Sequence, residues 1–174
     1  MASEKVHERT RAVSTTLGLL KSAASNPHFH ASPTFPRPGL LAGRLVACVG
    51  APEVDVSSQA LQGLHFLHSL MKRQAAPGTR MGWGKAEQQH GQEEKLDLPG
   101  CSEMRANFLE LIKELGQLLT PDQLTDLILT VTGGLKEASE SNMEASKAAL
   151  TLILNKYKHG LQAQVVISRM CGKV

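Results

Sequence analysis

Aromatic residues are scarce in this sequence: they make up 3% of its 174 residues, as one Trp, one Tyr and four Phe. Hydrophobic residues still amount to 41%, so a core must be aliphatic and supplied mainly by Leu. Few aromatic and β-branched residues, together with many Leu, Ala, Gln and Glu, favour helix over sheet. A chain of this length can form one domain with a substantial core, or two small ones.

Cysteine, long apolar runs and an excess of one charge are also lacking. Cys48, Cys101 and Cys171 are an odd number of thiols at wide spacings, which indicates reduced thiols in a cytoplasmic protein rather than a disulfide framework. No apolar run reaches the roughly 18 residues of a membrane-spanning helix, so none is predicted. The polar N-terminus does not resemble a secretory signal. A net charge of +3, scattered along the chain, does not indicate a nucleic-acid surface.

The stretch 101–159 predicts three consecutive amphipathic helices with short turns. Apolar residues recur at three- and four-residue steps in the first two helices. The first stripe contains Met104, Phe108, Leu111, Ile112, Leu115, Leu118 and Leu119, and the second contains Leu124, Leu127, Ile128, Val131 and Leu135. Between them, Thr120 and Gln123 are spaced as a capping box around Pro121, which suits the first helical position.

The third of these helices is predicted from about Asn142 to Lys158, with Ser141 and Glu144 as its start signal. It is apolar on several sides, at Leu150, Leu152, Ile153 and Leu154. A helix of this kind needs cover on more than one face, so we expect it to lie between neighbouring helices.

The remaining chain predicts further helices at Ser3–Ala24, Gly39–Val49 and Pro52–Arg73, and a short one at Leu161–Met170. Asn26–Pro38 holds four prolines in thirteen residues and should not be helical. Gln74–Gly100 is rich in Gly, Gln and charge without periodicity, which predicts a disordered, flexible insert. The predicted organisation is therefore 1–73 and 101–174 as helical halves, with 74–100 between them.

Four of the predicted helices share an Ala followed by a Leu-rich stripe. The alanines are Ala12, Ala60, Ala106 and Ala148, separated by 48, 46 and 42 residues. This spacing is close to the period of HEAT and armadillo repeats, about 40–47 residues. A small Ala would let each helix approach its neighbour closely. Two units also share a layout of a short helix, a break and a longer helix: Gly39–Val49 with Glu53–Arg73, and Asp122–Lys136 with Asn142–Lys158.

These residues resemble a known family. The segment PGLLAGRLVACVGAPEVDVSSQALQGLHFLHSLMK, with SEKVHERTRAVSTTLGLLK before it, is similar to the maestro HEAT-like repeat family, and LTPDQLTDLILTVTGGLKEASESNMEASKAALTLILNKY looks like a later helix pair of the same kind. The resemblance implies an α-solenoid and no catalytic residues. Family members are similar long arrays, so three to four units imply a fragment or a short isoform.

A zinc site is one chemical alternative. His65 and His68 lie three apart on a predicted helix, and Cys48 lies in the helix before it, but a zinc site needs further converging ligands. We expect both histidines on the solvent side. His28 and His30, in the proline-rich segment, have no metal-ligand spacing to other residues. For Cys48, we expect a buried structural thiol rather than a nucleophile.

Other candidate residues also have simpler structural interpretations. Glu93, Glu94 and Asp97 fall in the flexible segment, where catalytic geometry is not available. Gly133 and Gly134 lack the pattern of a phosphate loop and are expected to loosen a helix near its end. Trp83 is either a linear anchor for a partner or an exposed linker residue. The basic C-terminal residues could meet an anionic membrane or only solubilise a helix; they are Lys156, Lys158, His159, Arg169 and Lys173.

The sequence therefore predicts an all-α fold, a HEAT/armadillo-like antiparallel helix-pair stack with a disordered insert. Such stacks present an extended surface, so the expected function is a non-enzymatic protein–protein interaction scaffold that binds other proteins. No catalytic, cofactor-binding or metal residue is assigned, and no cofactor or nucleic acid is expected. The alternative is a peripheral membrane-associated adaptor that uses its basic C-terminal helices.

Overall fold

Six helices make up the regular structure of the part of the chain that the computed structural model describes, residues 2–26, 37–75, 101–137 and 140–157. Within this part no strand occurs. Each predicted helix that falls here is observed, with ends within two residues of the expected ones. The helices are α1 (Ala2–Ser25), α2 (Pro38–Val49), α3 (Val54–Ala75), α4 (Cys101–Leu118), α5 (Pro121–Glu137) and α6 (Glu140–Tyr157).

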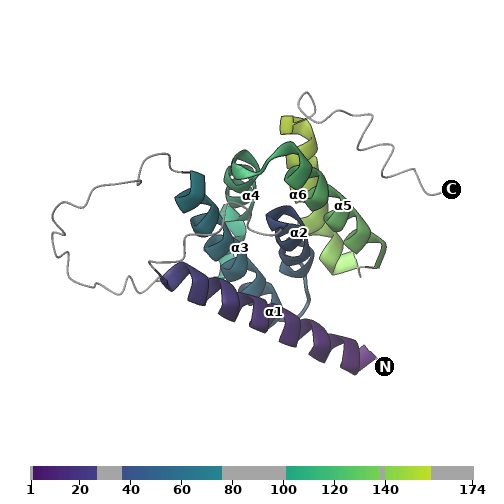
Figure 1. The fold of residues 1–174 in the computed structure, drawn as a ribbon. Helices are drawn as coiled ribbons and strands as arrows, with labels where there is room; N and C mark the ends of the chain where they lie inside the picture. Colours follow the sequence, from purple (N-terminus) through teal and green to yellow (C-terminus); the bar gives the residue numbers. More distant parts are fainter. Residues whose placement is uncertain (1, 27–36, 76–100, 138–139, 158–174) are drawn as a thin grey trace.

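The helices form two layers (Figure 1). One layer is a row in which each helix packs on the next, in the order α1, α3, α4, α6. The other layer consists of α2 and α5, which pack on each other; α2 also contacts α3 and α6, and α5 contacts α6. This arrangement confirms the predicted HEAT-like all-α fold. The four helices of the row are those that share the Ala–Leu pattern, so the sequence repeat marks one layer of the stack.

The repeated alanines are not all contact points, however. Ala60 is completely buried in α3, whereas Ala12 is exposed on α1 and Ala148 is partly exposed on α6. In α6 the buried small residue is the next one, Ala149. The expected role of the Ala in close helix approach is therefore met by Ala60 and is wrong for Ala12, because Ala12 is exposed rather than packed against α3.

Glycines allow a close approach between α2 and α5. A Cβ added at Gly39 would lie 1.7 Å from the backbone oxygen of Gln123, and one at Gly43 would lie 2.6 Å from Cβ of Thr130. Further along, a Cβ at Gly134 would lie 3.2 Å from Ala47. The residue numbers of the contacting pairs increase along both helices, so α2 and α5 run parallel, as equivalent helices of successive repeats do.

One aliphatic core extends through both layers. Its largest fully buried side chains come from α2, α3, α4, α5 and α6, that is, from both sides of the segment 76–100. They include Val46, Leu61, Leu64, Leu67, Ile112, Leu115, Leu127, Ile128 and Ile153. The predicted stripes of α4 and α5 are buried apart from Leu118 and Leu135, which are half-buried, and Met104, whose side chain is not described.

The helix starts show why these boundaries occur. The backbone N–H of Thr120 donates to Oε1 of Gln123 at 3.0 Å, and the N–H of Gln123 donates to Oγ1 of Thr120 at 3.4 Å. The predicted capping box at α5 is therefore confirmed. The start signal assigned to Ser141 is wrong, because α6 is already helical from Glu140. Pro38, expected in the loop, is the first residue of α2.

Three predictions lie outside the described residues. They concern most of the proline-rich segment, residues 76–100 of the expected insert and the helix expected at Leu161–Met170. Gln74 and Ala75 belong to α3.

Candidate interaction surfaces

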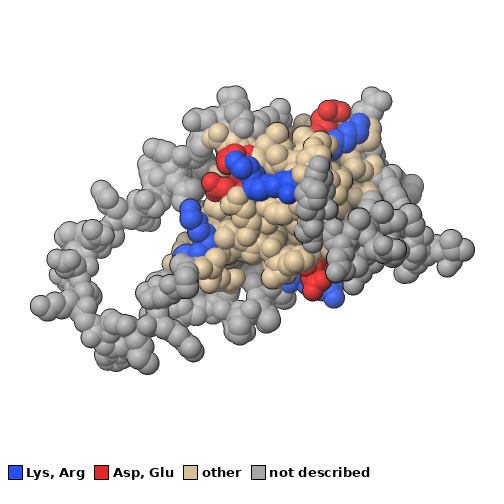
Figure 2. Space-filling view, turned by 90° about the horizontal axis from the view of Figure 1, so that it is seen from above, with Lys and Arg blue, Asp and Glu red and all other residues tan. Residues whose placement is uncertain are grey.

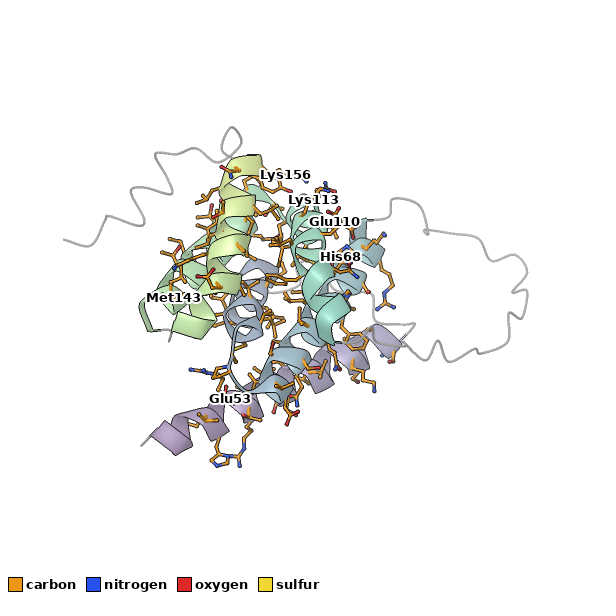
Figure 3. The ribbon with its side chains drawn as sticks, turned by 180° about the vertical axis from the view of Figure 1, so that it is seen from behind. Glu53, His68, Glu110, Lys113, Met143 and Lys156 are labelled. Carbon is orange, nitrogen blue, oxygen red and sulfur yellow. The ribbon has the colours of Figure 1, made fainter. Side chains whose placement is uncertain are left out.

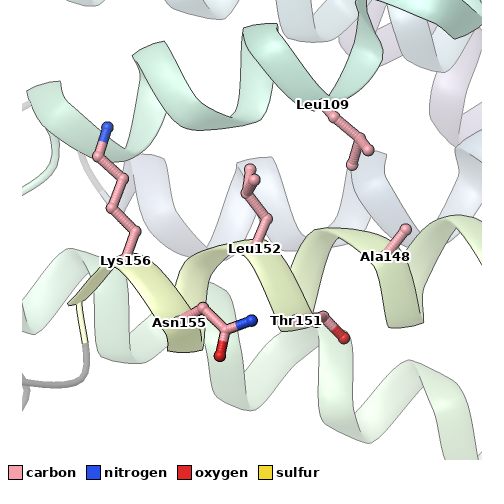
Figure 4. A pocket seen from close by; sticks show the side chains of 6 residues that line it. All are labelled: Leu109, Ala148, Thr151, Leu152, Asn155 and Lys156. Carbon is pink, nitrogen blue, oxygen red and sulfur yellow. The ribbon is translucent and has the colours of Figure 1, made fainter.

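A shallow groove of about 590 Å³ runs between α4 and α6 (Figure 4). Its floor is apolar and comes from Leu109 of α4 with Ala148 and Leu152 of α6. Thr151, Asn155 and Lys156 add polar groups to its lining. The groove therefore offers hydrophobic area with one amide and one cation beside it, which suits a helical or peptide segment better than a reacting small molecule.

The groove exists because some apolar residues fall beside the buried stripes rather than on them. Leu109 follows the buried Phe108 and is 38% exposed, and Leu152 precedes the buried Ile153 and is half-buried. The expectation that α6 is covered on several faces is correct for its contacts with α2, α4 and α5. It fails for Leu154, which is 43% exposed.

Near the end of α6, Tyr157 brings the two helices into direct contact. A Cβ at Gly116 of α4 would lie 3.1 Å from the Tyr157 ring, so a larger residue there would require the ring to shift slightly. Burial raises the pKa of the Tyr157 phenol. Nζ of Lys156 lies 5.5 Å from the centroid of the same ring, within the range of a cation–π contact.

The outward side of α1 is a second candidate surface. Leu19 is 68% exposed there, and Thr15 and Ala12, four and seven residues earlier on the same side, are also exposed. Val13 and Leu20, each the next residue in the chain after Ala12 and Leu19, lie about 100° further round the helix and are buried against the core. A polar outer face usually terminates a helix stack in water. Here the end of the row combines exposed polar residues, Glu8 and Ser22 on the same side, with one large exposed Leu.

His68 contributes to the contact between α3 and α4 (Figure 3), and Glu114 of α4 lies close enough to His65 to affect it as well. Nε2 of His68 lies 3.2 Å from Oε2 of Glu114, and the His68 side chain is only 13% exposed. Burial lowers the pKa of both imidazoles, and the Glu114 carboxylate partly offsets this effect. The expectation that both histidines face solvent is wrong, because α4 covers this side of α3. Among the described residues, no group of three or more His, Cys, Asp or Glu could hold a metal ion.

Cys48 is half-buried against the core. Burial raises the pKa of its thiol, and the nearby Arg9 and Arg44 lower it by less. A raised pKa leaves less thiolate at neutral pH, and the thiolate is the nucleophilic form. This environment supports a structural thiol.

Gly133 and Gly134 differ in role. Nothing lies within 4 Å of a Cβ added at Gly133, whereas Gly134 is part of the α2–α5 crossing. The sequence interpretation missed that role. The signal that could have found it is the spacing of Gly39, Gly43 and Ala47, which puts three small residues on one side of α2.

Several sequence candidates have no described environment. These candidates lie outside the described residues, as does the side chain of Cys101: His28, His30, Trp83, Glu93, Glu94, Asp97, Lys158, His159, Arg169, Cys171 and Lys173.

Of the basic C-terminal residues that suggest membrane association, only Lys156 therefore lies among the described residues. On the face in Figure 2, the coloured Lys and Arg side chains form small groups interspersed with Asp and Glu. None of the helices in the described ranges has both the length and the apolar content to cross a bilayer.

Comparison with known proteins agrees with this architecture. The family model described as "Maestro, HEAT repeats" matches residues 7–172. A curated human (Homo sapiens) protein, Maestro heat-like repeat family member 5, is 27% identical to this chain over an alignment of 186 residues. The alignment covers 97% of this chain and 14% of that protein. The chain thus spans about one seventh of the length of this relative. No solved structure matches the chain.

Proposed function

The chain belongs to the Maestro HEAT-repeat family, and from this we propose that it is a non-enzymatic scaffold that binds other proteins. HEAT-like stacks act through extended surfaces rather than through reactive centres, although a fold alone does not define an activity. The observation that carries the proposal is the outward side of α1, where Leu19 is 68% exposed at the end of the helix row.

This surface suits an α-helical partner. Ala12, Thr15 and Leu19 are spaced as one side of a helix, and small residues with one large apolar side chain let a second helix pack against it. The inner side of α1 already packs on α3 in the row. A partner helix on the outer side would extend the row by one position. We include a cytoplasmic location in the proposal, on the basis of the odd number of widely spaced cysteines.

Affinity capture with matched variants tests the proposal. The tagged full chain, Leu19→Asp and Ser14→Asp would each be expressed in cells, and the bound proteins would be quantified by mass spectrometry. Ser14 is an exposed residue on another side of α1, so Ser14→Asp adds the same charge without altering the proposed surface. We expect specific proteins to be retained by the parent chain and by Ser14→Asp and depleted at least about tenfold by Leu19→Asp, the effect of about 1.4 kcal/mol of lost binding.

Identical partners and amounts for all three chains would contradict the use of this surface. Circular dichroism of Leu19→Asp provides the folding control. Because Leu19 is mostly exposed, its helical signal and melting temperature should match those of the parent chain.

A further inference from the structure

We propose that the segment Leu161–Met170 of this chain docks as a helix in the α4–α6 groove, running antiparallel to α6. The groove is the one lined by Leu109, Ala148, Thr151, Leu152, Asn155 and Lys156. The proposal goes beyond the scaffold function, because it assigns this groove to an intramolecular occupant and leaves the outward side of α1 for partners.

Chain length supports this occupant. The groove follows α6 from Ala148 to Lys156, about 12 Å at roughly 1.5 Å per helical residue. The ten residues Leu161–Met170 would form a helix about 15 Å long, so they can cover the whole groove. Described helix α6 ends at Tyr157, one residue beyond the end of the groove. Residues 158–160, which include Gly160, then connect the two helices, and a connection of about 2–5 residues is typical of antiparallel helix pairs.

The apolar pattern of the segment matches the floor of the groove. Four apolar residues recur at steps of three, one and three and so fall on one side of a helix; they are Ala163, Val166, Ile167 and Met170. An antiparallel return from Gly160 places Val166 opposite Leu152 and Met170 opposite Ala148. On this alignment the segment covers Leu152 and Leu109, which the helices of the described part leave partly exposed.

Covalent linkage favours this segment over a separate partner. A short connection keeps the segment at an effective concentration in the millimolar range near the groove. A contact with a dissociation constant below the millimolar range is then mostly formed, whereas a separate partner at lower concentration would have to bind much more tightly.

Disulfide formation in the full chain tests the proposal, because the native Cys171 adjoins Met170 and should lie close to position 148. Ala148→Cys would be made together with Cys48→Ala and Cys101→Ser, so that only two thiols remain. Lys147→Cys in the same background is the matched control, since Lys147 is exposed on another side of α6. Disulfides form readily only when the Cα atoms approach within about 7 Å. We expect the intramolecular disulfide to form at least about tenfold faster for Ala148→Cys than for Lys147→Cys, beyond the effect of tethering alone.

Two further variants separate docking from chance encounters. Val166→Asp with Ile167→Asp removes the apolar side of the segment and should reduce the rate for Ala148→Cys to that of the control. Gln164→Asp, on another side of the segment, should leave the fast rate unchanged. Equal rates at positions 147 and 148 would overturn the proposal. A disulfide formed mainly between two chains would also overturn it, in favour of a second copy as the occupant.

Discussion

At the scale of single residues, the most demanding position is Gly43 in the α2–α5 crossing. A Cβ there would lie 2.6 Å from Cβ of Thr130 and 3.0 Å from the backbone oxygen of Leu127. Backbone cannot move aside cheaply, so Gly43→Ala should lower the free energy of unfolding by about 1–3 kcal/mol, the usual cost of overpacking. Urea denaturation followed by circular dichroism measures the change.

Gly18→Ala is the matched control for this prediction. Gly18 lies inside α1, and nothing is within 4 Å of an added Cβ. Ala is a better helix former than Gly, so this substitution should raise the free energy of unfolding by about 0.5–1 kcal/mol. Opposite signs for two Gly→Ala changes would establish that close packing, rather than helix propensity, decides the effect at Gly43. A neutral Gly43→Ala would mean that α2 and α5 can separate without cost.

His65 and His68 make the stability depend on pH. Burial lowers the pKa of both below the ordinary histidine value of about 6.5, so the unfolded chain binds more protons than the folded chain as the pH falls through that value. The free energy of unfolding should therefore decrease on acidification through this range, before most carboxylates titrate. Urea titrations at pH 7.5, 6.5 and 5.5, values that bracket the usual histidine pKa of about 6.5, measure the slope.

Replacing both histidines by Gln should flatten this slope. His7→Gln is the control, because His7 is exposed on α1 and its replacement should leave the slope unchanged. A stability that rises on acidification would contradict the prediction, since it would mean that the Glu114 carboxylate outweighs the burial of the imidazoles.

At the scale of helices, α6 offers a direct comparison of two neighbouring residues. Ile153 is 1% exposed, whereas Leu154 is 43% exposed. Ile153→Ala should lower the free energy of unfolding by about 2–5 kcal/mol, because it empties a buried aliphatic site. Leu154→Ala should change it by less than about 0.5 kcal/mol. Similar losses for both would show that another part of the chain covers Leu154.

Helix positions were largely predictable because periodicity, prolines and caps are local signals. The capping box of Thr120 and Gln123 is an example: four residues of sequence contain all the information that its geometry uses. Contacts between helices were less predictable. The small-residue series on α2 faces α5, some eighty residues later, and the helical histidines face α4; neither partner can be identified from local spacing. The groove was not predicted for the same reason. It depends on which residues border the buried stripes of two separate helices, α4 and α6.

At the scale of the whole molecule, the segment between α3 and α4 is the feature to test. Helices on both sides of it share one core, and α2 packs on α5 and α6. We expect replacement of residues 76–100 by a Gly/Ser linker of about 12 residues to preserve a single cooperative unfolding transition. The free energy of unfolding should change by no more than about 0.6 kcal/mol, the entropic effect of halving a loop.

Urea denaturation monitored at the helical signal, at two or more protein concentrations, provides the measurement. A linker of the same length as the native segment is the control for composition. Two separate transitions in the shortened chain would mean that the contacts between the halves are too weak to couple them.

The parallel pairing of α2 with α5 also has a consequence during synthesis. Gly43 leaves the ribosome about eighty residues before Leu127, so at about 5–20 residues per second the apolar side of α2 waits ~4–16 s for the surface that covers it. The neighbouring α3 is available earlier and can shield only part of α2. The nascent chain therefore passes through a period in which a glycine-lined hydrophobic strip is open to chaperones and to other nascent chains, and slower translation between α3 and α5 would prolong it.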